Sequence, residues 1–224
     1  MLSHLLKKIA SKLPSRFQQE MKRLYFSMQI RRNSFKTDEK EYDHLGEWIK
    51  KGDWVLDVGA NIGHYTAKLS EIVGDTGRVI AFEPVPNTFE LLSANMAAGK
   101  FKNVTLLNVA VSDKTQIMGI EMPKFDTGLD NYYRAQLTAD SSSLQVMCLS
   151  VSDLKLTQPI KLIKIDAEGH DLFVLQGMED LLKRDYPVLI VEDDSEGVLE
   201  YLSSLGYGHS RIEDSHNLVF TKQD

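Results

Sequence analysis

The sequence predicts an α/β domain built around a mostly parallel β-sheet. Short apolar runs typical of buried strands alternate with segments of helical spacing, and a glycine turn joins the first such run to a helix. Strands that alternate with helices form βαβ units, whose crossovers are right-handed. We therefore expect parallel strands with helices on both faces of the sheet.

The expected elements follow one another from residue 39 onward. Helices are predicted over residues 39–51, 62–73, 86–98, 172–183 and 195–205. Strands are predicted over residues 54–58, 78–82, 104–111, 160–165 and 188–192. The apolar pieces at 207–212 and 218–221 flank a polar turn, and we expect them to close the sheet as a hairpin.

Residues 112–150 depart from this alternation. They are polar and rich in turn residues, with two short strand-like pieces near residues 116–121 and 144–149. We interpret this segment as an insertion over the carboxyl edge of the sheet, within a domain that spans residues 38–224. An acceptor pocket could form beneath it.

Residues 1–37 form a basic amphipathic arm in front of that domain. Residues 1–36 carry nine Lys and Arg against Glu20 alone, a net charge of +8, whereas the other 188 residues carry 17 against 31 acids, a net charge of −14. Apolar residues recur in the arm at helical spacing, and Pro14 should interrupt the helix. The arm either packs on the domain or forms a surface helix that makes a peripheral contact with anionic lipid or with a polymer-bound substrate.

Composition excludes several classes of protein. No apolar run approaches the length of a membrane-spanning helix, and lysines interrupt the apolar residues at the N-terminus where a signal peptide would need them. Cys148 is the single cysteine, which excludes an intrachain disulfide framework and any multi-cysteine metal site, and which suits a reducing, cytoplasmic location. The acidic body argues against a nucleic-acid partner, because phosphate binding needs clustered Lys and Arg.

The first strand runs directly into a glycine turn, Asp57-Val58-Gly59-Ala60-Asn61-Ile62-Gly63, that opens a helix. Open α/β sheets bind ligands at such turns, where bare backbone can approach a ligand closely. In a dinucleotide-binding Gly-x-Gly-x-x-Gly turn centred on Gly59, the outer glycines would stand where this chain has Asp57 and Ile62. The carboxylate disfavours a pyrophosphate and suits a cationic, phosphate-free cofactor, and S-adenosylmethionine has both properties.

Glu83 ends the second strand, 20 residues after Gly63. A carboxylate at this point can accept hydrogen bonds from both ribose hydroxyls of a nucleoside. Together with the glycine turn and the βαβ order, Glu83 predicts a nucleoside site at the carboxyl edge of the sheet. The alternative is a plain strand–turn–helix unit in which the glycines serve packing alone.

A second group of candidate residues follows the strand at 160–165. Asp166, Glu168 and His170 alternate there, so an extended chain would point them to one side, and Glu192 ends the next strand. Transfer of the cofactor's methyl group to the oxygen of an acceptor hydroxyl needs a base for the departing proton, and His170 is the first candidate for that base. Asp166 and Glu168 are candidates to orient the acceptor, to stabilise the sulfonium or to anchor the methionine part of the cofactor.

Each of these residues also has a structural interpretation. Asp166 can cap the following helix. Glu168 can pair with Lys164, and His170 can be an exposed residue of the first helical turn. The acids and the histidine could together bind Mg²⁺ or Ca²⁺. Nothing in the sequence requires a metal, so no metal ligand is assigned.

These motifs resemble the FkbM family of S-adenosylmethionine-dependent methyltransferases. The resemblance covers roughly residues 52–221, and the stretches that carry it are Asp57-Val58-Gly59-Ala60-Asn61-Ile62-Gly63-His64-Tyr65-Thr66, Ala81-Phe82-Glu83-Pro84, Asn108-Val109-Ala110-Val111-Ser112-Asp113 and Ile163-Lys164-Ile165-Asp166-Ala167-Glu168-Gly169-His170. One departure is Ser152, where the family usually has a carboxylate shortly before its fourth core strand.

The resemblance implies a Rossmann-like sheet of seven strands, mostly parallel, with its last strand antiparallel. It implies that Glu83 holds the ribose of S-adenosylmethionine and that Asn108 and Ala110 border the adenine. The full set of cofactor-binding residues that it implies is Asp57, Gly59, Asn61, Gly63, Glu83, Asn108 and Ala110. The implied reaction is O-methylation of a hydroxyl on a small-molecule or glycan acceptor such as a sugar, a glycolipid or a polyketide-type natural product.

Two other functions remain open at this point. One is a nicotinamide-dependent oxidoreductase, against which Asp57 and Ile62 count because they stand where that fingerprint needs glycine. The other is a non-catalytic nucleoside-binding or interaction module on the same fold.

Overall fold

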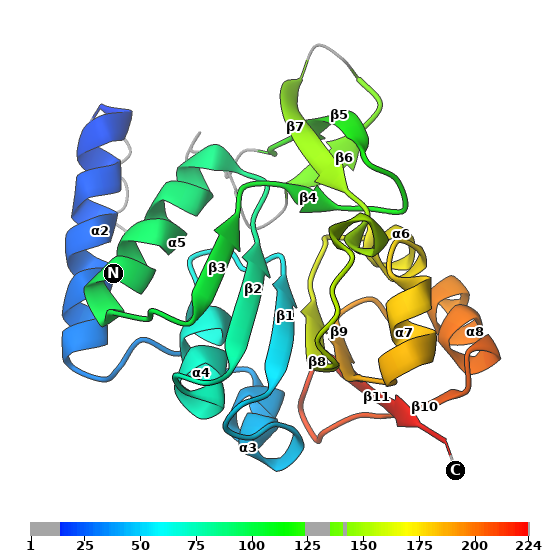
Figure 1. Cartoon of the computed structure of the whole chain (residues 1–224). Coiled ribbons are helices and arrows are strands. Elements are labelled where there is room, and N and C mark those ends of the chain that lie inside the picture. Colours follow the sequence, from blue (N-terminus) through cyan, green and yellow to red (C-terminus); the bar gives the residue numbers. More distant parts are fainter. Residues whose placement is uncertain (1–13, 124–134, 141–142, 224) are drawn as a thin grey trace.

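The structure is a computed structural model that describes residues 14–123, 135–140 and 143–223. A seven-stranded sheet runs through its centre in the order β10, β11, β9, β8, β1, β2, β3 (Figure 1). The strands are β1 Trp54–Val58, β2 Arg78–Phe82, β3 Val104–Leu107, β8 Ile160–Ile165, β9 Val188–Val191, β10 Tyr207–Ser210 and β11 Leu218–Lys222. Among these seven strands, β11 alone runs in the direction opposite to the other six. The predicted class and the antiparallel last strand are therefore confirmed.

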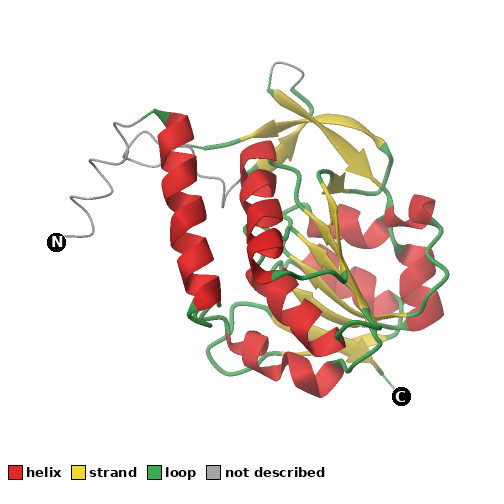
Figure 2. Cartoon of the chain, turned by 60° about the vertical axis from the view of Figure 1, so that its left-hand side comes forward, coloured by secondary structure: helices red, strands yellow, loops and turns green. Residues whose placement is uncertain are grey.

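Helices cover both faces of this sheet (Figure 2). Side chains alternate along each central strand, so Val55 and Leu56 enter two different apolar cores. The helices on the Val55 face are α3 Leu45–Trp48, α4 His64–Val73 and α5 Pro86–Gly99. The helices on the Leu56 face are α6 Asp171–Gln176, α7 Glu179–Asp185 and α8 Glu196–Ser204.

Two predicted helices are shorter or divided in the structure. The helix expected at residues 39–51 is a 3-10 turn, η1 (Lys40–His44), followed by the single turn of α3. The helix expected at residues 172–183 is broken after Gln176 into α6 and α7. At the break, a Cβ added to Gly177 would lie 2.0 Å from the carbonyl oxygen of Ser112, so only glycine allows this close approach.

The strand expected at residues 104–111 is also divided. It leaves the central sheet after Leu107 and resumes as β4 (Ala110–Val111) in a second sheet. That sheet has the order β4, β7, β5, β6, with β5 Gln116–Glu121, β6 Gln136–Thr138 and β7 Leu144–Leu149. It lies beyond the carboxyl ends of the central strands, where the insertion was expected (Figure 1). A 3-10 turn, η3 (Val151–Leu154), leads from β7 back to the central sheet.

The described part of the basic arm is a single helix, α2 (Ser15–Arg31), which packs along α5. Its Phe26 and Ile30 lie against the apolar core that α5 shares with the sheet, and the Phe26 ring contacts the Phe35 ring edge to face. Residues 1–13 of the predicted arm lie outside the described residues. No helix in the described part of the chain is both long enough and apolar enough to span a membrane.

A buried polar network joins the beginning of the domain to its last hairpin. The carboxylate of Glu41 accepts hydrogen bonds from the hydroxyls of Tyr65 and Ser215, at 2.8 and 2.6 Å, and from the side-chain amide of Asn217. Glu41 is fully buried, so these three donors replace the water that a carboxylate would otherwise bind.

Candidate active site

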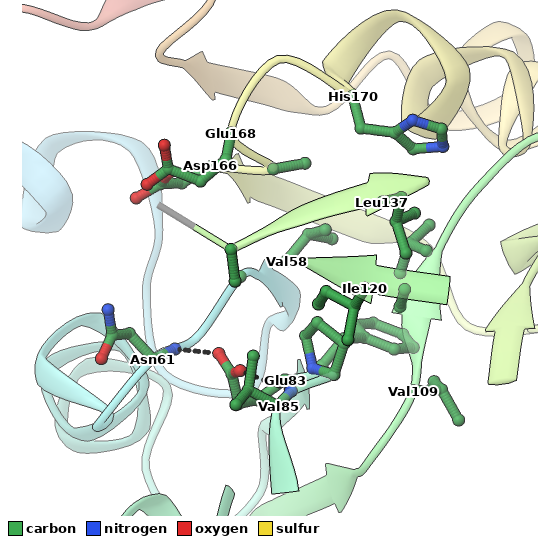
Figure 3. Close-up of a pocket in the computed structure, with 17 residues that line it drawn as sticks. Val58, Asn61, Glu83, Val85, Val109, Ile120, Leu137, Asp166, Glu168 and His170 are labelled. Atoms are coloured by element: carbon green, nitrogen blue, oxygen red, sulfur yellow. Dashed lines mark hydrogen bonds between the residues drawn. The ribbon is translucent and has the colours of Figure 1, made fainter. Parts of the chain in front are cut away.

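A pocket opens at the carboxyl edge of the central sheet, between that edge and the second sheet (Figure 3). The loops after β1, β2 and β8 contribute its polar residues, and the second sheet contributes Ile120 and Leu137. The candidate residues that line it are Gly59, Asn61, Glu83, Ala110, Asp166, Glu168 and His170. Asp57, Gly63 and Asn108 do not line it.

The loop after β1 is held tightly against its neighbours. The backbone N–H groups of Gly59 and Ala60 donate to the carbonyl oxygen of Phe82, at 3.0 and 2.9 Å. Gly59 has a positive φ of 76°, and a Cβ built on it would lie 1.9 Å from the carbonyl oxygen of Asp166. A glycine is therefore required here for two reasons, the backbone conformation and the close approach of the loop after β8.

Glu83 stands at the end of β2 with both carboxylate oxygens engaged. The N–H of Asn61 donates to Oε2 and the N–H of Val85 donates to Oε1, each at 2.9 Å (Figure 3). Burial raises the pKa of Glu83 to about 7, although the two N–H donors favour the charged form. Since a carboxylate oxygen can accept more than one hydrogen bond, Glu83 can also accept from ligand hydroxyls in the pocket.

Asp57 lies beneath the pocket. Asp57 is two residues after Val55, so both side chains lie on the face of β1 toward α4, where the Asp57 carboxylate accepts a hydrogen bond from the hydroxyl of Thr66. Its register partner on β8 is Lys164, which is equally buried. Burial raises the pKa of Asp57 to about 6. In this structure the Asp57 side chain therefore links β1 to α4 and does not line the pocket.

Two other predicted cofactor residues also have structural contacts. Gly63 precedes α4, and a Cβ on it would lie 2.7 Å from side-chain atoms of Leu92 and Met96, so this glycine permits α4 and α5 to pack closely. The side-chain amide of Asn108 donates to the carbonyl oxygens of Glu83 and Pro84, at 2.8 and 3.1 Å. Asn108 therefore fixes the backbone from which the Glu83 side chain projects.

The carboxylates after β8 and β9 form a cluster. Oxygens of Asp166, Glu168 and Glu192 all lie within 4.8 Å of one another, and Lys164 Nζ lies 3.6 Å from Asp166 Oδ2. The pKa of Glu192 is raised, first by its hydrogen bond with Asp166 and then by burial. Repulsion between these acids is therefore relieved by a proton and by one buried ammonium.

The expectation that Asp166, Glu168 and His170 project to one side is wrong. Glu168 and Gly169 both have positive φ, 51° and 86°, so the chain turns there instead of running extended. Figure 3 shows Asp166 and Glu168 together and His170 apart from them, nearer to Leu137. The helix-cap interpretation of Asp166 is also wrong, because α6 begins at Asp171 with His170 at its N-cap position.

His170 is held in one orientation by two contacts. Its ring stacks on Phe173, with ring centroids 4.7 Å apart, and its Nε2 lies 2.9 Å from the hydroxyl oxygen of Ser112. The Ser112 hydroxyl also lies 3.1 Å from Asp113 Oδ1, and when it donates there its oxygen can accept from Nε2–H, which leaves the Nδ1 lone pair free. Burial lowers the pKa of His170 below its usual value, which favours the neutral ring. Sequence reasoning did not identify Ser112 as this partner.

The chemistry of the lining residues tests which cofactor fits. Among the described residues that line the pocket there are three acids and one histidine, and none is Lys or Arg. A pyrophosphate would have no counter-charge there, whereas a cationic nucleoside would meet carboxylates at both ends. The residues therefore fit S-adenosylmethionine, which has a sulfonium, an ammonium and no phosphate.

The sequence profile of the methyltransferase FkbM domain matches residues 57–208, more than half of the chain. The chain belongs to the FkbM methyltransferase family. Membership confirms the methyltransferase family that the motifs predicted. The match is to a methyltransferase family and therefore disfavours the nicotinamide-dependent alternative.

Relatives with known names are similar over parts of their length. Hexuronic acid methyltransferase AglP of Haloferax volcanii is 28% identical over 143 residues, which cover 62% of this chain and 55% of that protein. Protein-L-isoaspartate O-methyltransferase 2 of Archaeoglobus fulgidus is 37% identical over 59 residues, which cover 26% of this chain and 27% of that protein. The chain thus spans about a quarter to about half of the length of these curated relatives.

Solved structures of methyltransferases share the fold. A methyltransferase FkbM from Methylobacillus flagellatus aligns with a TM-score of 0.55 at 16% identity, over 77% of this chain and 44% of that chain. An rRNA methylase from Streptococcus thermophilus aligns with a TM-score of 0.51 at 15% identity, over 82% and 95% of the two chains. A Streptococcus mutans protein in complex with SAH aligns with a TM-score of 0.51 at 13% identity, over 82% and 96%.

Proposed function

We propose that this protein transfers a methyl group from S-adenosylmethionine to a hydroxyl group of a neutral sugar, a glycolipid or a natural-product acceptor. The observation that carries the proposal is the neutral, oriented imidazole of His170 in the same pocket as Glu83 and Asp166. A hydroxyl is a poor nucleophile until a base takes its proton, and His170 is the pocket residue best suited to that task.

Different residues around the pocket would bind different parts of the cofactor. Glu83 would accept hydrogen bonds from the ribose hydroxyls, and the backbone of Gly59 would let the nucleoside lie against the glycine turn. Asp166 and Glu168 would face the positive charges of the methionine part. When bound, S-adenosylmethionine supplies an electrophilic methyl group on its sulfonium.

The acceptor hydroxyl would lie between His170 and the second sheet. His170 Nδ1 takes the proton of the hydroxyl as its oxygen becomes the nucleophile, and Ser112 holds the ring in the tautomer that leaves Nδ1 free of hydrogen. Ile120 and Leu137 form an apolar wall on this side of the pocket. Holding the acceptor oxygen at about 3 Å from the reacting carbon supplies a large part of the rate in such a transfer.

The relatives support a sugar acceptor, and the residues of the pocket favour an acceptor without negative charge. The name of the AglP relative gives hexuronic acid as its substrate. A uronate carboxylate would need a nearby cation, and none of the described lining residues is Lys or Arg. We therefore favour a neutral hydroxylated acceptor.

An acceptor screen with radiolabelled S-adenosylmethionine tests the proposal. Neutral sugars, uronic acids, glycolipids and polyketides are compared, and we expect label to pass to a neutral acceptor as an alkali-stable ether. Cofactor binding in calorimetry without transfer to any acceptor would instead support the non-catalytic nucleoside-binding module. Absence of binding to both S-adenosylmethionine and S-adenosylhomocysteine would contradict both functions.

A further inference from the structure

Helix α2 has a second apolar face that the domain leaves exposed. Phe17, Met21, Leu24 and Met28 are spaced four, three and four residues apart, so they lie on one face of the helix. Between 47% and 66% of each of these side chains is exposed. Tyr25, 53% exposed, extends the same face.

This face is not the one that packs on the domain. Phe26 and Ile30 make that contact, and at 3.6 residues per turn they lie on the side of the helix opposite Phe17 and Met28. A surface helix needs only one apolar stripe to pack on its own domain. The exposed stripe of α2 therefore exceeds what the fold requires.

Basic side chains flank the exposed stripe. The exposed ones within α2 are Arg16, Lys22, Arg23 and Arg31, and Arg32 follows directly. Glu20 is the single acid of the helix and pairs with Arg23 at 2.9 Å. By contrast, the chain after residue 36 carries a net charge of −14. Helix α2 thus presents a basic, apolar surface, whereas the chain after residue 36 is acidic.

We propose that α2 docks this protein on an anionic lipid surface, with Phe17, Met21, Leu24 and Met28 in the interface and the arginines at the headgroups. Apolar residues flanked by Lys and Arg are the pattern by which helices bind at the surface of a bilayer. Each basic residue near an anionic surface strengthens binding by about fivefold. The same surface repels the acidic body, so charge orients the protein with α2 toward the lipid.

Charge also argues against a second copy of this chain as the occupant. A twofold dimer through α2 would bring the same helix from each copy together, because such an interface uses one patch twice. Arg16, Arg23 and Arg31 of one copy would then face like charges on the other. An anionic bilayer satisfies both the apolar stripe and the charges, and this inference is independent of the reaction that the pocket catalyses.

Co-sedimentation of the full chain with vesicles tests the proposal. Phosphatidylcholine vesicles are compared with phosphatidylcholine–phosphatidylserine vesicles, in low salt and in high salt. We expect binding to the anionic vesicles and at least tenfold weaker binding in high salt, where charges are screened. The triple variant Met21→Ser, Leu24→Ser, Met28→Ser should lose at least tenfold in binding, and Arg31→Gln with Arg32→Gln about tenfold or more.

Two matched controls separate α2 from the rest of the surface. Ile117 and Met147, 68% and 47% exposed on the second sheet, are replaced by Ser, and Lys50 and Lys51 are replaced by Gln. Both controls should bind vesicles like the unchanged chain, and melting curves check that every variant is folded. Binding to neither vesicle type, or equal binding to both without salt dependence, would overturn the proposal. Self-association lost in the triple variant, without vesicle binding, would reassign the stripe to a dimer interface.

Discussion

The two acidic ends of the pocket are built differently. At the end of β2 a single carboxylate, Glu83, receives two backbone N–H donors. At the ends of β8 and β9 three carboxylates crowd within 4.8 Å, with one buried ammonium, Lys164, beside them. The first arrangement suits neutral hydroxyl donors, and the second has excess negative charge that a bound cation would relieve. One cofactor with a ribose and two positive charges can therefore use both ends.

The largest expected effect is a loss of stability of the fold, and it is tested by comparing two glycines, one at each end of the pocket. Gly59→Ala should destabilise the fold by several kcal/mol, because the new Cβ would overlap the carbonyl oxygen of Asp166 at a positive φ. Gly169 also has a positive φ, 86°, but an added Cβ would meet nothing within 4 Å. Gly169→Ala should therefore cost only about 1 kcal/mol. Urea unfolding measures both, and equal losses would contradict the role of close packing at Gly59.

The next effect concerns the ribose. Glu83→Ala should weaken binding of S-adenosylmethionine about 100-fold, because two hydrogen bonds to a carboxylate, each worth roughly 1.5 kcal/mol, are lost. The binding of adenosine should weaken to the same extent, since both ligands contain the ribose. Calorimetry measures both affinities, with Glu121→Ala, an exposed acid of β5, as the control. Unchanged adenosine affinity in Glu83→Ala would separate Glu83 from the nucleoside.

His170 belongs to neither acidic end, and its loss should affect the reaction alone. His170→Ala should lower kcat about 100-fold, the contribution typical of a general base, while the affinity for S-adenosylmethionine stays the same. Ser112→Ala should lower kcat less, because it removes the tautomer constraint and leaves the base. Turnover with the acceptor from the screen and calorimetry supply the two readouts. An unchanged kcat in His170→Ala would leave the histidine a structural role.

The carboxylate cluster should respond to ligand charge. Asp166→Asn should weaken the binding of S-adenosylmethionine about tenfold and leave the binding of adenosine nearly unchanged. Only S-adenosylmethionine carries positive charge near the cluster. This is the reverse of the pattern expected for Glu83, where both ligands weaken together. Competition binding of the two ligands measures the ratio, and equal weakening of both would remove the distinction between the two ends.

The smallest expected effect is a pH dependence of cofactor binding. Glu83 has a pKa of about 7, so acidification below that value protonates the ribose acceptor and should weaken binding about fivefold by pH 6. The stability of the fold should change with pH in the direction opposite to cofactor binding. The folded chain keeps a proton on Glu83 that the unfolded chain loses near 4.5, so the free energy of unfolding without ligand should fall as pH rises from 4.5 to 7. Calorimetry and urea unfolding across this range check both signs.

The local sequence pattern was sufficient to predict the strands at the centre of the sheet. It was insufficient where an element depends on a contact between residues far apart in the chain. The mainly apolar runs at residues 54–58, 78–82 and 160–165 coincide with β1, β2 and β8, because a strand buried on both faces is rich in apolar residues. The break at Gly177 depends on its contact with Ser112, 65 residues earlier, and no local signal reports such a contact. The departure of β4 from the line of β3 likewise depends on its pairing with β7.

The candidate site shows the same division. The position of Glu83 at the pocket follows from strand order alone. The orientation of Asp57 toward α4 follows from its position two residues after Val55, on the same face of the strand. The turn at Glu168 was signalled only by the following Gly169, and the Ser112 contact that holds His170 had no local signal. Chemistry-bearing residues were thus easier to identify than the direction in which each one points.

The Glu41 network has a consequence for how this chain reaches its native state during synthesis. Ser215 and Asn217 lie 174 and 176 residues after Glu41, so they leave the ribosome long after it does. Until they arrive, burying the Glu41 carboxylate would remove its water without supplying two of its three donors. The full set of donors for the buried Glu41 carboxylate is therefore complete only after residues 215–217 have joined the fold.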